Sequence, residues 1–305
     1  MLMTASLHNP DTFLLEGHAC PAPRLDPGLY VTSTPIGHLA DVTLRALQVL
    51  AAADLILCED TRVSRKLTQK YGIETPLRAY HDHNAESVRP GILNKLGTGA
   101  AIALVSDAGT PLVSDPGFKL VRAALEQSIP VTAVPGASAP MAALTIAGLP
   151  SDRFLFAGFP PAKKGQRETF FKSFLGLNAT LVFFISARKL GPVLAEMQDF
   201  LGNRQAVVAR ELTKLHEEVL RGDLSELQSV VSARAALKGE VTLLVAGAGD
   251  NDLPDGDSLD QMIEQALLTD SVRDVASTLA QALSLPRRQI YLRALELSKS
   301  GKHGD

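Results

Sequence analysis

Short apolar runs alternate with stretches of helical periodicity along most of the chain. In the first part, the runs fall at 29–35, 54–60, 101–109 and 130–136. Helical spacing of apolar residues predicts helices over 44–52, 61–71 and 117–127. Val- and Ile-rich runs that alternate with helices are typical of an open α/β sheet with mainly parallel strands. We therefore expect an N-terminal α/β domain over residues 28–140, preceded by a flexible extension over 1–27.

The same alternation restarts between residues 140 and 150. Apolar runs at 154–159, 180–186, 205–213 and 241–249 predict strands, and 167–175 and 190–201 have helical spacing. This second series predicts a C-terminal α/β domain over residues 150–249. The fold class expected for the whole body is therefore two open α/β domains.

A third pattern follows an acidic linker that begins at residue 250. Apolar residues at helical spacing predict three short helices within 258–302, with boundaries at Ser271 and Pro286. Three such helices suggest a small helical tail that resembles a helix-turn-helix bundle. Its last helix is basic, with Arg287 and Arg288 at the start and Lys302 just beyond the end. It could pack on the body as a solvated helix or serve as an arm that contacts phosphates.

Composition narrows the class of protein. No stretch reaches the 18 apolar residues of a membrane span, and the first 27 residues lack the basic and apolar parts of a signal peptide. Cys20 and Cys58 have no zinc-site spacing. We expect a cytoplasmic protein with no metal and no membrane partner. A net charge of -3 means that any polyanion must be held by local basic patches.

Unusual polar clusters stand at the ends of the predicted strands, where open α/β sheets bind their ligands. The longest, SDAGTPLVSDPG over 106–117, uses twelve residues where a simple turn needs about two to six. Glycines let a ligand approach the backbone, prolines stiffen a loop, and Asp accepts hydrogen bonds from hydroxyl or ammonium groups. Neither GxGxxG nor GxxxxGK[ST] is present. The clusters are TPIGH (34–38), CEDTR (58–62), SDAGTPLVSDPG, VPGASA (134–139) and RELTKLHEE (210–218).

These motifs resemble, in order and spacing, those of the ribosomal RNA small subunit methyltransferase I family of the tetrapyrrole (corrin/porphyrin) methylase superfamily. The resemblance covers about residues 28–248 and the tail. It implies a homodimer that binds S-adenosyl-L-methionine (SAM) between two α/β domains. It also implies methyl transfer to the ribose 2'-hydroxyl of a cytidine in the decoding region of 16S rRNA, cytidine 1402 in the family, within the 30S subunit.

The resemblance also implies a set of SAM contacts. These are Pro35, Gly37, Asp107, Gly109, Val113, Ser138, Ala139, Leu212 and Thr242. Three departures from the family pattern stand beside them: His38 replaces Asn, Ala137 replaces Pro, and FFISARK over 183–189 replaces a segment like FYESPHR. No contact around 186–189 is therefore carried over from the family.

The chemistry is mainly a matter of positioning, because the sulfonium of SAM is already activated. A ribose hydroxyl is a poor nucleophile and would gain from a base or from a cation beside the forming alkoxide. The candidates for these roles are Glu59, Asp60, Glu211 and Lys214. The candidates for contacts to RNA are Arg62, Lys163, Lys164, Arg167, Arg287 and Arg288.

Each candidate has a plainer interpretation. Asp107 and Asp115 could cap the helix that follows them. Glu59, Asp60 and Arg62 could be a solvated helix start, and Glu211 could simply pair with Lys214.

Two further motifs have plain readings as well. The basic residues 163–167 could be a solvated loop. His81 and His83 have a spacing that suits a metal, yet no third ligand is evident.

Two other functions fit parts of the sequence. A methyltransferase that acts on carbon of a tetrapyrrole would have this fold, but it would leave EDTR, RELTKLHEE and the basic tail without a purpose. A non-catalytic SAM-binding or RNA-binding module would need the pocket without the transfer. Labelled SAM offered with 30S subunits or with uroporphyrinogen distinguishes the three.

Overall fold

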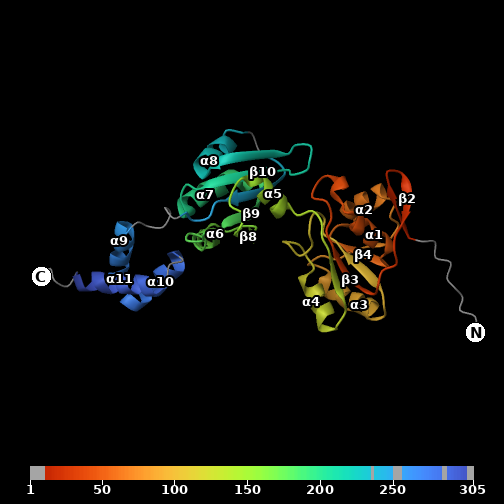
Figure 1. Cartoon of the computed structure of the whole chain (residues 1–305), viewed down its shortest axis with the longest axis horizontal. Coiled ribbons are helices and arrows are strands. Elements are labelled where there is room, and N and C mark those ends of the chain that lie inside the picture. The colour runs from red at the N-terminus through yellow and green to blue at the C-terminus, as the bar shows by residue number, and fades with distance from the viewer. Residues whose placement is uncertain (1–10, 235–236, 250–255, 284–286, 301–305) are drawn as a thin grey trace, which may run out of the picture. The chain divides into compact units, whose positions relative to one another are not determined.

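A computed structural model describes residues 11–234, 237–249, 256–283 and 287–300 (Figure 1). The chain forms two compact units. The first comprises Met1–Ala142 with Leu212–Leu215, and the second comprises Ala143–Glu211 with His216–Asp305. The expected linker before 256, Pro286 and Lys302 lie outside the described residues.

The first unit is built on a parallel sheet of five strands in the order β5-β4-β6-β3-β7. Because all five strands run the same way, the loops that follow them gather at one edge. The strands are β3 (Gly28–Thr32), β4 (Leu55–Cys58), β5 (Leu77–Ala79), β6 (Ala101–Leu104) and β7 (Val131–Val134).

Helices cover both faces of this sheet (Figure 1). Alternate side chains of a strand point to opposite faces, so Ile56 packs with the α1 side while Leu57 packs with the α3 side. This two-sided burial explains the continuous apolar runs in the sequence. The helical elements are η1 (Leu39–Asp41), α1 (Leu44–Ala52), α2 (Thr61–Lys70), α3 (Ala85–Gly97), α4 (Phe118–Glu126) and α5 (Ala139–Ala147).

Part of the segment expected to be a flexible extension is an ordered hairpin. Strands β1 (Thr12–Leu15) and β2 (His18–Pro21) pair antiparallel across Glu16 and Gly17, which both have positive φ. Such a two-residue turn suits the twist of a hairpin. Phe13 is buried in the core beside α1, and this burial fixes the hairpin. An isolated Phe gives no periodic pattern, which is why the sequence did not indicate the hairpin.

The second unit has a mixed sheet in the order β11-β10-β12-β9-β8. Only β8 and β9 are parallel, and the other neighbours are antiparallel, in contrast to the parallel sheet of the first unit. The difference arises because β10 returns directly as β11 without a crossover helix. The strands are β8 (Phe154–Gly158), β9 (Thr180–Ser186), β10 (Gln205–Arg210), β11 (Glu218–Asp223) and β12 (Glu240–Val245).

One face of this sheet packs on helices through a large apolar core. Leu181, Phe183 and Ile185 of β9 alternate into it and meet Leu194 and Met197 of α7. Helix α8 begins with a capping box between Asp223 and Glu226. The helical elements here are α6 (Lys164–Lys172), η2 (Ala187–Lys189), α7 (Leu190–Leu201) and α8 (Leu224–Ser232).

The C-terminal part forms the three helices that the spacing predicts, α9 (Gly256–Leu267), α10 (Val272–Leu283) and α11 (Arg287–Ser300). They enclose a small core of their own. Its buried members are Ile263, Val275, Ala276, Leu279, Ile290 and Ala294. Among the described residues, no helix is both long and apolar enough to cross a membrane.

Candidate active site

The loops after β3 and β6 are joined by a pair of backbone hydrogen bonds. The Thr34 amide donates to the Gly109 carbonyl at 2.8 Å, and the Gly109 amide donates back to the Thr34 carbonyl at 3.0 Å. Gly109 has φ +82°, and a Cβ there would stand 3.3 Å from Cγ2 of Ile36. A side chain at this position would therefore be strained, which explains the glycine.

Hydroxyl groups extend this junction to the loop after β7. The Ser33 and Thr110 hydroxyls lie 3.0 Å apart, and the Thr110 hydroxyl donates to the Ala137 carbonyl at 3.2 Å. The Thr34 hydroxyl donates to the Ser106 carbonyl at 3.2 Å. Three loops thus form one hydrogen-bonded layer at the carboxyl edge of the sheet. Ala137 contributes its backbone carbonyl, which a proline would also offer, so this departure from the family pattern keeps the contact.

The long loop over 106–117 is held in an uncommon conformation. Leu112 and Ser114 have φ of +72° and +65°, values that cost energy for residues other than glycine. Gly117 ends the loop as the N-cap of α4, which has no side-chain capping bond. The N-cap residue of this helix is therefore neither Asp107 nor Asp115. Strained backbone of this kind at the end of a strand is typical of ligand sites.

Acidic groups cluster where the loops after β4 and β6 meet. The amide of Asp60 donates to Oδ1 of Asp107 at 2.9 Å. Burial raises the pKa of Glu59 above its ordinary value, and the charges of Asp107 and Asp82 raise it further. Hydrogen bonds from the side chain and backbone of Arg62 lower the pKa of Asp60 to about 2. Neighbouring carboxylates with opposite shifts are a mark of acid–base sites.

Asp60 is also the N-cap of α2, and the Arg62 side chain is 87% exposed. The plain interpretation as a helix start therefore describes Asp60 and Arg62 well. It does not describe Glu59, which is half-buried and whose pKa the charge of Asp107 helps to raise.

Sequence reasoning missed two residues beyond the end of β5. The hydroxyl of Tyr80 and Nη1 of Arg89 are buried without a hydrogen-bond partner among the described residues, and so is Nδ1 of His81. Burial raises the pKa of Tyr80, which Arg89 partly offsets. The YHDHN stretch suggested only a metal, and the described residues contain no group of three metal ligands.

The segment Leu212–Leu215 packs directly on Gly37. A Cβ at Gly37 would stand 2.6 Å from Cγ of Lys214 and 3.0 Å from the Leu212 carbonyl. The backbone amide of His38 donates to the Thr213 hydroxyl at 3.0 Å. This bond does not involve the His38 side chain, so an Asn at this position could make it as well. The structure thus brings Gly37 of the TPIGH motif close to Leu212 and Lys214 of the RELTKLHEE motif.

The remaining expected SAM contacts fall in three places. Val113 lies half-buried in the 106–117 loop, and Pro35 is buried beside Thr34. Ser138 and Ala139 are half-buried at the start of α5. In the second unit, Thr242 is 4% exposed in β12, between Ala209 and Phe184 of the neighbouring strands.

The candidates for catalysis and RNA contact in the second unit differ in their surroundings. The Glu211 carboxylate accepts the Glu240 amide at 2.9 Å. Arg167 forms a two-pronged ion pair with Glu196, with both distances at 2.6 Å. Lys163 and Lys164 are exposed, as are Arg287 and Arg288 on α11.

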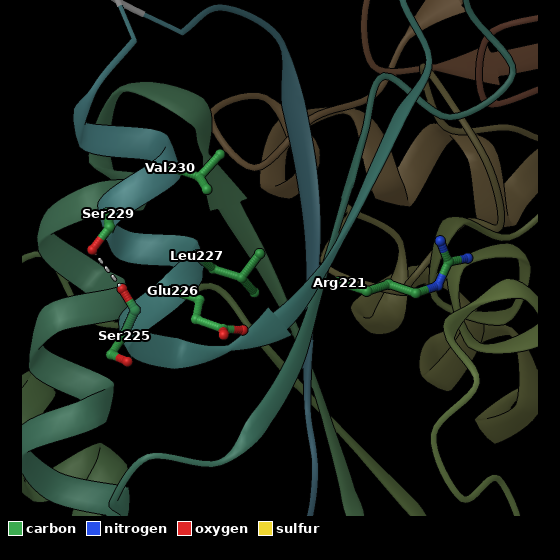
Figure 2. Close-up of a pocket in the computed structure, with 6 residues that line it drawn as sticks. All are labelled: Arg221, Ser225, Glu226, Leu227, Ser229 and Val230. Carbon is green, nitrogen blue, oxygen red and sulfur yellow. Dashed lines mark hydrogen bonds between the residues drawn. The ribbon is translucent and has the colours of Figure 1, made fainter.

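A hollow of about 530 Å³ lies beside α8 and is lined by none of the predicted site residues. Its polar groups are already engaged: Ser229 donates to the Ser225 carbonyl, and Arg221 points away from α8 and donates to the Ile146 carbonyl (Figure 2). The hollow therefore offers no set of convergent groups for a ligand. It is lined by Arg221, Ser225, Glu226, Leu227, Ser229 and Val230.

Comparison with known proteins defines first the class and then the family. The family model described as Tetrapyrrole (Corrin/Porphyrin) Methylases matches residues 28–228. The fold is similar to diphthine synthase, with TM-score 0.56 and 14% identity over 72% of this chain and 90% of that one. It is also similar to uroporphyrin-III-C-methyltransferase from Thermus thermophilus, with TM-score 0.53 and 19% identity over 72% and 94%.

Sequence relatives are much more similar than these structures. The chain is 46% identical to the "Ribosomal RNA small subunit methyltransferase I" of Mesorhizobium japonicum over 93% of this chain and 97% of the relative. It is 42% identical to the protein of that name from Synechocystis, over 90% and 99%. The chain is therefore a methyltransferase that belongs to the ribosomal RNA small subunit methyltransferase I family of the tetrapyrrole methylases.

Proposed function

We propose that this protein transfers a methyl group from SAM to the ribose 2'-hydroxyl of a cytidine in the decoding region of 16S rRNA. In this proposal the substrate is the 30S subunit in the cytoplasm, and the enzyme is a homodimer. The observation that supports it most is the similarity to proteins named for small-subunit rRNA, which extends over nearly their whole length.

The layer of loops at the edge of the first sheet suits SAM. Gly37 and Gly109 allow the close packing that fixes these loops, against the 212–215 segment and against Thr34, and the Asp107 carboxylate can accept hydrogen bonds from hydroxyl or ammonium groups. SAM supplies an electrophilic methyl group on a positively charged sulfur. The loops then have to orient the cofactor and exclude water, and the fixed Thr34–Gly109 pairing favours that role.

Among the four candidates for catalysis, Glu59 is the strongest candidate for the base. Its raised pKa makes it a better proton acceptor than an ordinary carboxylate, whereas the low pKa of Asp60 makes that group a weak base. The Glu211 carboxylate is engaged with the Glu240 amide. Lys214, beside Gly37, could stabilise the charge on the forming alkoxide.

Labelled SAM with purified, unmethylated 30S subunits tests the proposal. We expect label in 16S rRNA at one cytidine whose 3' phosphodiester resists alkaline cleavage, because a methylated 2'-oxygen cannot attack the phosphate. Uroporphyrinogen offered in parallel should receive no label. Transfer to uroporphyrinogen alone would favour the tetrapyrrole activity, and SAM binding without transfer to either would favour a non-catalytic module.

A further inference from the structure

A cluster of aromatic rings is exposed at the end of β8. Phe159 is 61% exposed, and its ring lies 5.4 Å from that of Phe184, which in turn lies 4.9 Å from Phe156. Phe184 thus supports the Phe159 ring, and most of Phe159 stays exposed. A ring that is supported on one side and exposed on the other can stack on a planar group of a partner.

The segment that follows this ring, a short loop and the first turn of α6, is basic, and two prolines stiffen its start. Residues 160–167 read PPAKKGQR, with three basic residues, two prolines and no acid. Lys163 and Lys164 are exposed, and the ion pairs found among the described residues involve neither of them. The loop therefore presents two positive charges next to an exposed aromatic ring.

Arg167 holds this loop in place. Its guanidinium donates to both carboxylate oxygens of Glu196 at 2.6 Å, and Nη1 donates to the carbonyls of Pro161 and Ala162 at 3.2 and 2.7 Å. The Arg167 and Glu196 side chains are each only 14% exposed. Arg167 is thus used to fix the backbone that presents Lys163 and Lys164, and it is not presented to solvent as a phosphate ligand.

We propose that Phe159, Lys163 and Lys164 form a docking surface for a single-stranded part of the rRNA substrate, with Arg167 and Glu196 as positioning residues. An unstacked base would lie on the open side of the Phe159 ring, and the two lysines would contact the flanking phosphates. This is how proteins commonly hold single-stranded RNA. The inference rests on the proposed function.

Charge favours RNA over a second copy of the chain as the partner. In a symmetric contact between two copies, the same patch faces itself, so Lys163 and Lys164 would approach their own counterparts. No acid within 159–167 is available to offset that repulsion. A polyanion with planar bases matches both the charge and the ring.

Binding to unmethylated 30S subunits over a range of salt concentrations separates the parts of the surface. Phe159→Leu keeps an apolar contact with Phe184 but loses the ring, so the affinity should fall about 5-fold to 100-fold with little change in salt dependence. Replacing Lys163 and Lys164 by Gln should lower the slope of log K against log salt by about 1.4. SAM affinity should stay unchanged in both variants.

Matched variants control for general effects. Phe154→Leu removes an exposed ring at the other end of β8, and replacing Lys95 and Lys119 by Gln removes the same charge from exposed sites on α3 and α4. Both should bind 30S subunits like the wild type. For the positioning role, Glu196→Gln is decisive: it removes a negative charge yet should weaken binding, whereas simple electrostatics would strengthen it.

The possible failures are distinct. If the wild type does not methylate 30S subunits, the proposed function fails. If it does, but Phe159→Leu and the double lysine variant bind like the wild type, this surface fails alone. Light scattering that shows Phe159→Leu to be monomeric while the wild type is dimeric would make the cluster a subunit interface and overturn the inference.

Discussion

The amide of Asp60 donates a 2.9 Å hydrogen bond to the carboxylate of Asp107, and this bond joins the loops after two neighbouring strands of the first sheet. One oxygen of Asp107 is used in the junction, and a carboxylate has further lone pairs for a ligand. The position of Asp107 is thereby set before any ligand binds.

Asp107→Ala should weaken SAM binding by about 1 to 3 kcal/mol, because a polar contact to the cofactor is lost and the Asp60 amide loses its acceptor. Asp107→Asn retains an oxygen that can accept the hydrogen bond from the Asp60 amide but carries no charge. Its loss of SAM affinity should be smaller than that of Asp107→Ala if the bond to Asp60 is the main contribution. Calorimetric titration with SAM measures both. An unchanged affinity in Asp107→Ala would remove this residue from the cofactor site.

Gly37→Ala should impair SAM binding more than its size suggests. The added Cβ would meet Lys214 Cγ and Thr213 Oγ1 at 2.6 Å, so the 212–215 segment must shift. Gly165→Ala is a suitable control, since a Cβ there meets nothing within 4 Å. Titration with SAM and thermal melting check the pair; equal SAM affinity in Gly37→Ala and the wild type would show that the packing on Gly37 is irrelevant to the cofactor.

Glu59 and Asp60 should affect the pH dependence of the free energy of unfolding in opposite ways. The raised pKa of Glu59 means that its contribution to stability is present at low pH and is lost as the pH rises through the folded-state value. The lowered pKa of Asp60, about 2, means that its contribution is present above its ordinary value of 3.8 and is lost as the pH falls towards 2.

If Glu59 is the base, kcat/KM for 30S subunits should rise with pH through its raised pKa, because only the ionised form accepts the proton. Glu59→Gln should abolish this rise of kcat/KM with pH and lower kcat by about 100-fold to 10,000-fold. A pH–rate profile of the variant that keeps the wild-type limb would assign the base elsewhere.

Removal of residues 250–305 should lower the affinity for 30S subunits and its dependence on salt, while SAM affinity stays intact. Arg287 and Arg288 are exposed at the start of α11, whereas Arg293 is engaged with Asp260 and Glu296. The positive charge that the truncation removes from contact with phosphates should therefore be mainly that of Arg287 and Arg288. Binding and methylation equal to the wild type at every salt concentration would leave the tail a purely structural role.

Elements with strong periodicity were predictable from the sequence. The helices over 44–52 and 190–201 and the strand over 180–186 have the expected bounds, because buried faces impose a regular apolar spacing. Helix α3 was missed because Pro90 and Gly91 lie inside it. Strand β11 was missed because its side chains are only half-buried and give no apolar run.

The motifs of the candidate site were visible in the sequence, but their connections were not. The bond from Asp60 to Asp107 joins residues 47 positions apart, and nothing local indicates it. Arg167 illustrates the same limit: beside Lys163 and Lys164 it resembles a phosphate ligand, and only the fold brings it to Glu196 on α7. The burial of the Tyr80 hydroxyl beside Arg89 likewise depends on tertiary packing.

The position of the transferred methyl group tests the central claim most directly. After incubation with SAM and unmethylated 30S subunits, the 16S rRNA should contain one cytidine in the decoding region with a methylated ribose oxygen, seen as resistance to alkaline cleavage and as a 2'-O-methylcytidine nucleoside by mass spectrometry. A methyl group on the base of that nucleotide with its ribose unmodified, or no methylation of 30S subunits by an enzyme that binds SAM, would contradict the account.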